Sequence, residues 1–227
     1  MRSPEQTVLA LDASTYAGSV ALVRRNVVLH EVQVPMRGET EERLMPAVVA
    51  VLERAGLELG TVDAIACGAG PGSFTSLRIA GAIAKGLAVS RALPLVVASS
   101  LTLMIAGSDE LEAGDYLATL DAMRGDVYAQ GVRRSDGGHV QELGAPQLMT
   151  RAAAQELATA AGWKTVGATG SQLTGEPRAR GFARLLESVA QEVDARTWEP
   201  LYGRMAEAQV LWERQHGRPL SSSTPHA

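Results

Sequence analysis

Aromatic residues and cysteine are scarce in this chain of 227 residues. Aromatics make up 4% of the sequence although apolar residues make up 46%. The interior must therefore be built mainly from Ala, Val and Leu packed around glycine, a composition that suits layered α/β structure. The only cysteine, Cys67, excludes an internal disulfide and is typical of a reducing compartment, so we expect a cytoplasmic protein.

Long hydrophobic runs and a strong charge of one sign are also missing. No apolar stretch approaches the ~18 residues that span a bilayer, and residues 1–6 lack the features of a secretory signal. With 25 acidic and 21 basic residues, the surface lacks the positive footprint of a protein that holds RNA through phosphate contacts alone. We therefore expect no membrane association, and contact with RNA only through a partner.

Metal-ligand spacing is absent as well. The histidines at positions 30, 139, 216 and 226 are scattered, and Cys67 lies on an apolar strand without a partner for nucleophilic chemistry. The sequence predicts neither a metal site nor a nucleophile.

The first half of the chain begins with three strands, a helix, a strand and a helix, and one more strand and helix follow. Apolar periodicity and cap residues predict these elements. Thr40 is expected to cap the first helix, and Pro46 is expected to kink or restart it. The predicted strands are 7–11, 18–23, 27–34, 62–67 and 95–98, and the predicted helices are 40–55, 73–91 and one from about Ser99.

The same order returns in the second half. Strands at 116–120, 127–133 and 139–143 precede a helix capped by Thr150, a strand at 165–168 and a helix at 182–193. The order βββαβα thus occurs twice, which predicts an α/β fold with two ribonuclease-H-like subdomains and a cleft between them. The expected divisions are residues 1–106 with a returning helix at 205–216, residues 107–204, and a disordered tail at 217–227.

Two polar loops are candidates for binding phosphate. In the first, Asp12, Ser14 and Thr15 follow a strand end, where the hydroxyls and backbone N–H groups can hold phosphate and Asp12 can orient a metal-bound water. The alternative is an Asx or ST turn that closes a hairpin, and on spacing alone this alternative is favoured.

The second loop contains Gly70, Gly72 and Ser73 ahead of a helix. Glycine permits close backbone approach, and the free N–H groups at a helix start attract anions. A strand-to-helix connection capped by serine explains the pattern equally well. No Gly-Lys-Ser/Thr follows, so the loop is not a Walker motif.

Small residues recur every fourth position along the helix that follows. They are Ser76, Ala80, Ala84 and Ala88, and they form one stripe that another helix can approach closely. Packing onto the chain's own sheet is at least as good an explanation from periodicity alone.

Residues 70–80 read Gly-Pro-Gly-Ser-Phe-Thr-Ser-Leu-Arg-Ile-Ala, which closely resembles the signature GPGSFTGLRIG of the TsaB family, also called YeaZ. Ser76 and Ala80 stand where that family usually has Gly, and Ala13 where it usually has Thr. The resemblance extends to residues 9–15, 42–46, 120–128 and 200–204.

The resemblance implies an actin-like ATPase (ASKHA) fold and a role as the non-catalytic subunit that assists a TsaD-like enzyme. That enzyme installs threonylcarbamoyl on the adenosine at the 3′ side of the tRNA anticodon, giving threonylcarbamoyladenosine (t6A). The implied partners are the TsaD-like subunit and a TsaE-like ATPase, with a homodimer when the chain is alone and tRNA contacted only through the complex. No cofactor is expected for the chain alone, whereas ATP or ADP is expected within the complex.

The resemblance also implies where the partner docks and why the chain itself lacks catalysis. The helices at 40–55 and 73–91 would face the TsaD-like subunit, with Leu44 and Val48 as apolar anchors beside the stripe of small residues. TsaD carries two metal-binding histidines where this chain has Ser100 and Met104, and a hydroxyl with a thioether makes no competent zinc or iron site.

Two other functions remain open from the residues. An independent ASKHA-type kinase or ATPase would use Asp12 and the glycine loops on phosphate. A metallopeptidase is the weakest alternative, since no metal-binding pair is present.

Overall fold

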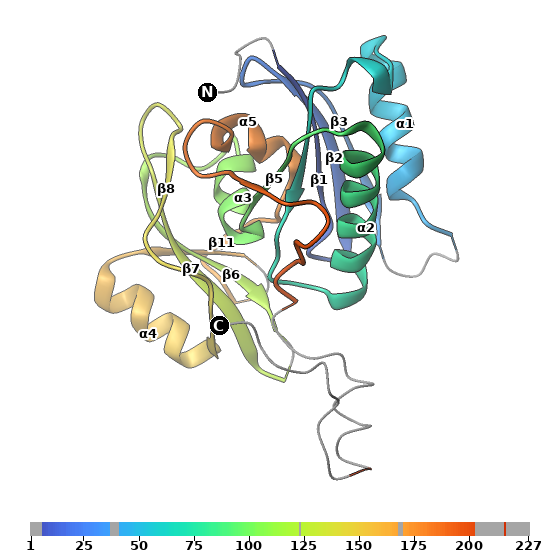
Figure 1. The fold of residues 1–227 in the computed structure, drawn as a ribbon. Coiled ribbons are helices and arrows are strands. Elements are labelled where there is room, and N and C mark those ends of the chain that lie inside the picture. Colours follow the sequence, from blue (N-terminus) through green and yellow to red (C-terminus); the bar gives the residue numbers. More distant parts are fainter. Residues whose placement is uncertain (1–5, 37–40, 123, 168–169, 203–215, 217–227) are drawn as a thin grey trace.

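The computed structural model describes residues 6–36, 41–122, 124–167, 170–202 and 216, and within them it consists of two sheets with helices on their faces (Figure 1). The first sheet has the strand order β12-β5-β4-β1-β2-β3, in which β1, β4 and β5 are parallel and β1, β2 and β3 are antiparallel. Its strands are β1 (Thr7–Asp12), β2 (Ala17–Arg24), β3 (Val27–Pro35), β4 (Ala64–Gly68), β5 (Leu95–Ala98) and β12 (Gln191–Val193).

The second sheet repeats this pattern, with the order β11-β10-β6-β7-β8 and with β9 also paired to β7. Antiparallel β6, β7 and β8 come first in the chain, and β10 then joins β6 in parallel after a helix. The predicted α/β class and the repeated strand order are therefore confirmed. Its strands are β6 (Gly114–Asp121), β7 (Asp126–Arg134), β8 (Val140–Glu142), β9 (Gln147–Thr150), β10 (Lys164–Gly167) and β11 (Leu173–Thr174).

The helices divide the core into three clusters. Helices α1 and α2 cover one face of the first sheet, α4 covers the outer face of the second, and α3 lies between the two sheets (Figure 1). Every residue of α3 is buried, as expected for a helix whose residues are apolar or small on all sides. The helices are α1 (Leu44–Ala55), α2 (Phe74–Arg91), α3 (Ser100–Gly107), α4 (Arg151–Ala161) and α5 (Phe182–Leu185), with short 3-10 turns η1 (Leu59–Thr61) and η2 (Ala179–Gly181).

Helix α1 begins later than predicted. The side chain of Glu42 accepts hydrogen bonds from the backbone N–H groups of Leu44 and Met45, so the helix starts at Leu44. Pro46 therefore falls in the first turn, where its missing N–H would have no intrahelical partner, and it does not interrupt the helix. Thr40, the expected cap, lies outside the described residues.

The predicted helix at 182–193 is wrong beyond Leu185. The N–H groups of Val189 and Ala190 both donate to the carbonyl of Leu185, which ends the helix, and residues 191–193 form β12 on the edge of β5. Pairing with β5 satisfies backbone groups that a bare sheet edge would leave open. The first sheet thus includes residues that were expected to belong to the second subdomain, residues 107–204. The expected helix at 205–216 lies outside the described residues except for His216. The expected tail at 217–227 lies outside them entirely.

Within the described residues, no helix is both long enough and apolar enough to cross a membrane.

Candidate functional site

The carboxylate of Asp12 lies at the end of β1, fully enclosed by protein. It accepts hydrogen bonds from the backbone N–H of Ser14 at 3.0 Å, from the Ser14 hydroxyl at 2.8 Å and from the Ser100 hydroxyl at 2.6 Å. Burial raises the pKa of Asp12, and these hydrogen bonds offset part of that rise. The carboxylate is thus satisfied internally and does not face solvent.

The rest of this loop forms the local turns that the alternative interpretation predicted. The bond from the Ser14 N–H to Asp12 is an Asx turn. The Thr15 hydroxyl both accepts from the N–H of Ala17 at 3.2 Å and donates to the carbonyl of Ala17 at 3.0 Å, as in an ST turn.

The glycine loop packs directly on the Asp12 loop. The N–H of Ser73 donates to the carbonyl of Ser14 at 2.7 Å, and the N–H of Gly70 donates to the Ser100 hydroxyl at 3.1 Å. A Cβ at Gly72 would lie 2.1 Å from the carbonyl oxygen of Ser14, so this contact requires glycine. The structure thus places the two predicted loops side by side. Ser14 bonds to Asp12 and to Ser73, whereas Thr15 bonds to Ala17 and Gly70 to Ser100.

Ser73 precedes α2 but does not cap it with its side chain. Its hydroxyl lies 3.1 Å from the hydroxyl of Ser76 instead. The start of α2 therefore has no side-chain cap from Ser73, although the sequence predicted a strand-to-helix connection capped by this serine.

Ser100 and Met104, which stand where the TsaD-like enzyme has metal-binding histidines, are both buried. Ser100 is hydrogen-bonded to Asp12, and Met104 packs in the central core between the sheets. Among the described residues, no group of three or more His, Cys, Asp or Glu side chains is placed to hold a metal ion.

The six residues predicted to contact a partner are all buried within the chain, so that prediction is wrong. Each is at most 3% exposed. The small side chains of α2 face the sheet, because small residues at every fourth position let the helix lie close to β1 and β4. The stripe therefore packs onto the chain's own sheet, which was the alternative explanation of the periodicity. The six residues are Leu44, Val48, Ser76, Ala80, Ala84 and Ala88.

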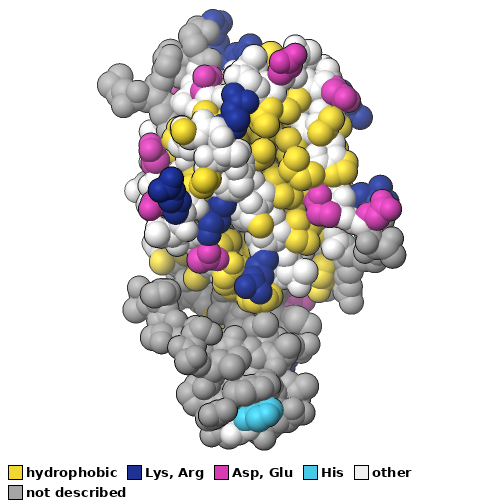
Figure 2. Space-filling view, turned by 45° about the vertical axis from the view of Figure 1, so that its right-hand side comes forward, with side chains coloured by type: hydrophobic (Ala, Val, Ile, Leu, Met, Phe, Trp, Pro, Cys, Tyr) yellow, Lys and Arg dark blue, Asp and Glu magenta, His cyan; other side chains and the backbone are white. Residues whose placement is uncertain are grey.

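The outer faces of the same helices are unusually apolar. Met45 and Val49 on α1 and Val89 on α2 are 38%, 48% and 47% exposed, and Ala82 is also exposed. Figure 2, which brings this side of the molecule forward, shows a band of hydrophobic side chains with acidic and basic side chains around it. The surface that α1 and α2 present to solvent therefore consists of these exposed residues, and not of the buried stripe of small residues on α2.

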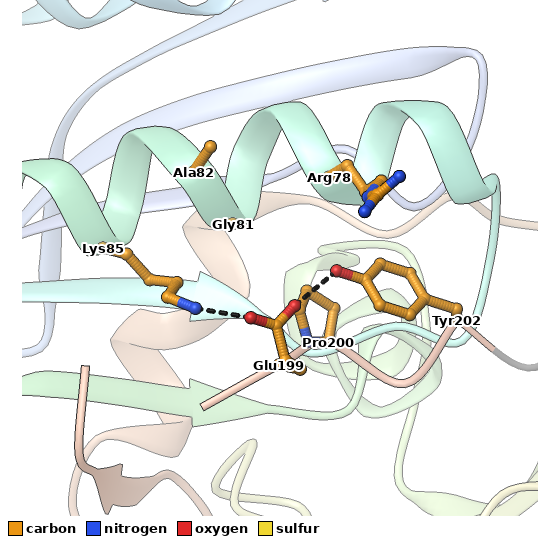
Figure 3. Close-up of a pocket in the computed structure, with 7 residues that line it drawn as sticks. All are labelled: Arg78, Gly81, Ala82, Lys85, Glu199, Pro200 and Tyr202. Carbon is orange, nitrogen blue, oxygen red and sulfur yellow. Dashed lines mark hydrogen bonds and ion pairs between the residues drawn. The ribbon is translucent and has the colours of Figure 1, made fainter. Parts of the chain in front are cut away.

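A hollow of about 350 Å³ adjoins this surface between α2 and residues 199–202 (Figure 3). Lys85 Nζ lies 2.6 Å from Glu199 Oε1, and the Tyr202 hydroxyl donates to Glu199 Oε2 at 2.7 Å. The hydrogen bond from Lys85 is the main cause that lowers the pKa of Glu199, whereas burial, aided by Glu199, raises the pKa of Tyr202 to about 12.

The sequence analysis did not predict this hollow, although the spacing of residues on α2 indicates it. Arg78, Gly81 and Lys85 are spaced by three and four residues, so they lie on one face of a helix with a gap between two cations. Pro200 sits opposite that gap, where a Cβ at Gly81 would lie 3.0 Å from Pro200 Cγ.

Known proteins resemble this chain over most of its length. A family model described as TsaD, tRNA N6-adenosine threonylcarbamoyltransferase, matches residues 37–176. The tRNA threonylcarbamoyladenosine biosynthesis protein TsaB of Haemophilus influenzae is 34% identical over 235 aligned residues, covering 93% of this chain and 98% of its own. The Escherichia coli protein of the same name is 38% identical over 132 residues, covering 58% of this chain and 57% of its own.

Solved structures agree with this likeness. A Pseudomonas aeruginosa protein described as similar to peptidase YEAZ has a TM-score of 0.74 and 30% identity, covering 88% of this chain and 100% of its own. YeaZ from the same organism has a TM-score of 0.70 and 26% identity, with coverages of 87% and 99%.

Proposed function

Because the chain belongs to the TsaB family of tRNA threonylcarbamoyladenosine biosynthesis proteins, we propose that it is the non-catalytic partner of a TsaD-type threonylcarbamoyltransferase. The observation that carries the proposal is the likeness to the Haemophilus influenzae protein over 93% of this chain. A role in t6A modification of tRNA follows from the family, and an independent kinase or ATPase is not favoured.

The chemistry of the candidate site supports a non-catalytic role. Asp12 is fully buried, and the Ser73 N–H that could hold phosphate donates to Ser14 instead. Ser100 supplies a hydroxyl to Asp12 at the first of the two positions where the TsaD-like enzyme binds metal. A catalytic group must reach the reacting atoms, and burial leaves Asp12 and Ser100, which bond to each other, badly placed for that.

Nucleotide enters this proposal only through the assembled complex. The isolated chain needs no cofactor, and ATP or ADP acts once the TsaD-type enzyme and a TsaE-type ATPase have joined. Equilibrium dialysis of the isolated chain with labelled ADP should give no saturable binding. ATP turnover by the isolated chain that Asp12→Ala abolishes would instead revive the kinase or ATPase interpretation.

The partner surface is the outer face of α1 and α2. Met45 and Val49 on α1 and Val89 on α2 are exposed apolar side chains, and Figure 2 shows a hydrophobic band on this side of the molecule, a feature that often marks a protein interface. The TsaD-type subunit would cover them in the complex, and a second copy of the chain would cover them when the partner is missing. The chain carries a net charge of −4, which supports contact with tRNA through the complex. The pathway and the single buried Cys67 support a cytoplasmic location.

Two neighbouring valines test the surface. Val49 is exposed and Val48 is 2% exposed. Val49→Glu should leave the melting temperature nearly unchanged and weaken binding to the TsaD-type subunit at least about tenfold, because a charge would be buried in the interface. Val48→Glu should lower the melting temperature strongly. Normal binding by Val49→Glu would place the interface elsewhere.

Nucleoside analysis of tRNA tests the function itself. Depleting this protein from its own cells should lower t6A, and adding the wild-type chain back should restore it. Unchanged t6A after depletion would overturn the assignment. In a reconstituted reaction, the chain without the TsaD-type subunit should transfer no threonylcarbamoyl.

A further inference from the structure

The side chains that line the hollow between α2 and residues 199–202 carry two positive charges and one negative charge. Lys85 is neutralised by Glu199 and also donates to the carbonyl of Trp198 at 2.7 Å. Arg78 lies at the other end of the same hollow, where its charge also acts on Glu199 and Tyr202. Within the described part of the chain, however, no carboxylate forms an ion pair with Arg78 within 4.0 Å, so one carboxylate serves two cations. Figure 3 shows Lys85 extending from α2 to Glu199, with Arg78 farther along the same helix, near Tyr202.

Aromatic rings hold the guanidinium group of Arg78 in place. Its Cζ lies 4.9 Å from the centroid of the Phe74 ring and 6.0 Å from that of Tyr202, and the two rings are themselves 4.9 Å apart. A guanidinium held by rings loses less conformational freedom when it forms hydrogen bonds, and its planar edge matches a carboxylate. Arg78 is therefore arranged to receive an anionic group.

The hollow is continuous with the apolar outer face of α1 and α2. Ala82 is exposed and lines the hollow, and it shares a face of α2 with Val89, seven residues later. A partner that covers this face would also cover the hollow and remove water from it. Arg78 would then lose its hydration, and Glu199, which is shared with Lys85, would offset only part of that cost, so an opposite charge from the partner would be favoured there.

We propose that the protein that covers the α1 and α2 face inserts the carboxylate of an Asp or Glu side chain into this hollow, where it pairs with Arg78. The inference rests on the proposed function, because it names the chemistry that the TsaD-type subunit must present. The occupant is a protein side chain, since an exposed arginine holds a free carboxylate only weakly, whereas the apolar face supplies the rest of the affinity.

Binding to the TsaD-type subunit of the same organism tests the pairing. The dissociation constant is measured by titration calorimetry with the full-length chain. Arg78→Ala should weaken binding at least about 30-fold, Arg78→Glu should weaken it further, and Arg78→Lys should fall between wild type and alanine. Lys164→Glu is the matched control, because this exposed lysine lies on β10 in the second sheet, and its binding should stay within about twofold of wild type.

A charge swap identifies the occupant. Single Asp→Lys and Glu→Lys variants of the TsaD-type subunit are tested against Arg78→Glu, and one of them should restore binding while weakening binding to wild type. If Arg78→Ala and Arg78→Glu bind within twofold of wild type although Val49→Glu does not, the pairing is wrong and the proposed function stands. If Arg78→Glu alters only self-association, the occupant is a second copy and the inference is overturned. If the wild-type chain does not bind the subunit at all, both proposals fail.

Discussion

At Gly72, the contact between the two loops depends on the absence of a side chain. A Cβ there would lie 2.1 Å from the carbonyl oxygen of Ser14, and that carbonyl also accepts the hydrogen bond from Ser73. Backbone atoms cannot move aside as a flexible side chain can, so the loops would have to separate.

Gly72→Ala should therefore lower the free energy of unfolding by about 1–3 kcal/mol. The matched control is Gly86→Ala on the exposed face of α2, where a Cβ would meet nothing within 4 Å. Alanine favours a helix by about 0.5–1 kcal/mol over glycine, so this control should be stabilised. Urea unfolding of both variants measures the difference, and equal midpoints would contradict the tight contact.

Asp12 should make the protein less stable as the pH rises. Burial raises the pKa of Asp12 above the ordinary value of an aspartate, so the folded state binds its proton more tightly than the unfolded state does. The free energy of unfolding then falls as the pH rises from about the unfolded pKa to the raised folded pKa, and stays low above it. Asp12→Asn should remove this pH-dependent loss of stability, because an amide does not titrate. Its oxygen can still accept the hydrogen bonds from Ser14, so the local structure is kept.

The difference in unfolding free energy between Asp12→Asn and wild type should therefore grow in favour of the variant from acidic to neutral pH. Asp115→Asn gives a contrast of opposite sign. The hydrogen bond from Arg133 is the main cause that lowers the pKa of Asp115, so its stabilisation is present above the unfolded pKa and is lost as the pH falls. An Asp12→Asn profile parallel to that of wild type would contradict the argument.

Among the elements, helix α3 ends against two arginines. Arg134 Nη1 donates to the carbonyls of Ile105 at 2.8 Å and of Ser108 at 2.7 Å, and Arg184 donates to the carbonyl of Ala106. These carbonyls have no intrahelical partners, and a cation near the carboxyl end of a helix also interacts well with the helix dipole.

Arg134→Met should lower the free energy of unfolding by roughly 2–4 kcal/mol, since it leaves the buried carbonyl of Ile105 and the partly buried carbonyl of Ser108 without this donor. Arg133→Met, one residue earlier on β7, removes only an exposed ion pair with Asp115 and should cost less than about 1 kcal/mol. Thermal unfolding compares the neighbours. Equal losses would show that the carbonyls of α3 find other partners.

Local patterns allowed most elements to be predicted from the sequence, but not the faces they present. The sequence showed that Ala80, Ala84 and Ala88 share a face of α2, yet small residues suit packing on a sheet as well as on another helix. Strand β12 was missed because its pairing with β5 joins residues almost a hundred positions apart in the chain. The polar loops at Asp12 and Gly72 were located correctly, whereas their bonding to each other required coordinates.

At the scale of the whole molecule, the two sheets share one core. The cluster around α3 contains Ala66 from the first sheet and Ala118 from the second, together with Leu103 of the helix. Strand β12 also returns to the first sheet after the second has been completed. Neither half can therefore lose α3 without exposing buried apolar surface of the other, so we expect both halves to unfold in one cooperative transition.

Two single-tryptophan variants test this cooperativity. Trp163 packs against the cluster under α4, and Trp198 packs against the cluster under α1 and α2. Each is kept in turn while the other and Trp212 are replaced by Phe. Their fluorescence should give the same urea midpoint, and Leu103→Ala should lower the free energy of unfolding by about 2–5 kcal/mol for both probes, because the side chain is fully buried. Separate midpoints, or a shift seen by one probe alone, would mean that the two halves fold independently despite the helix they share.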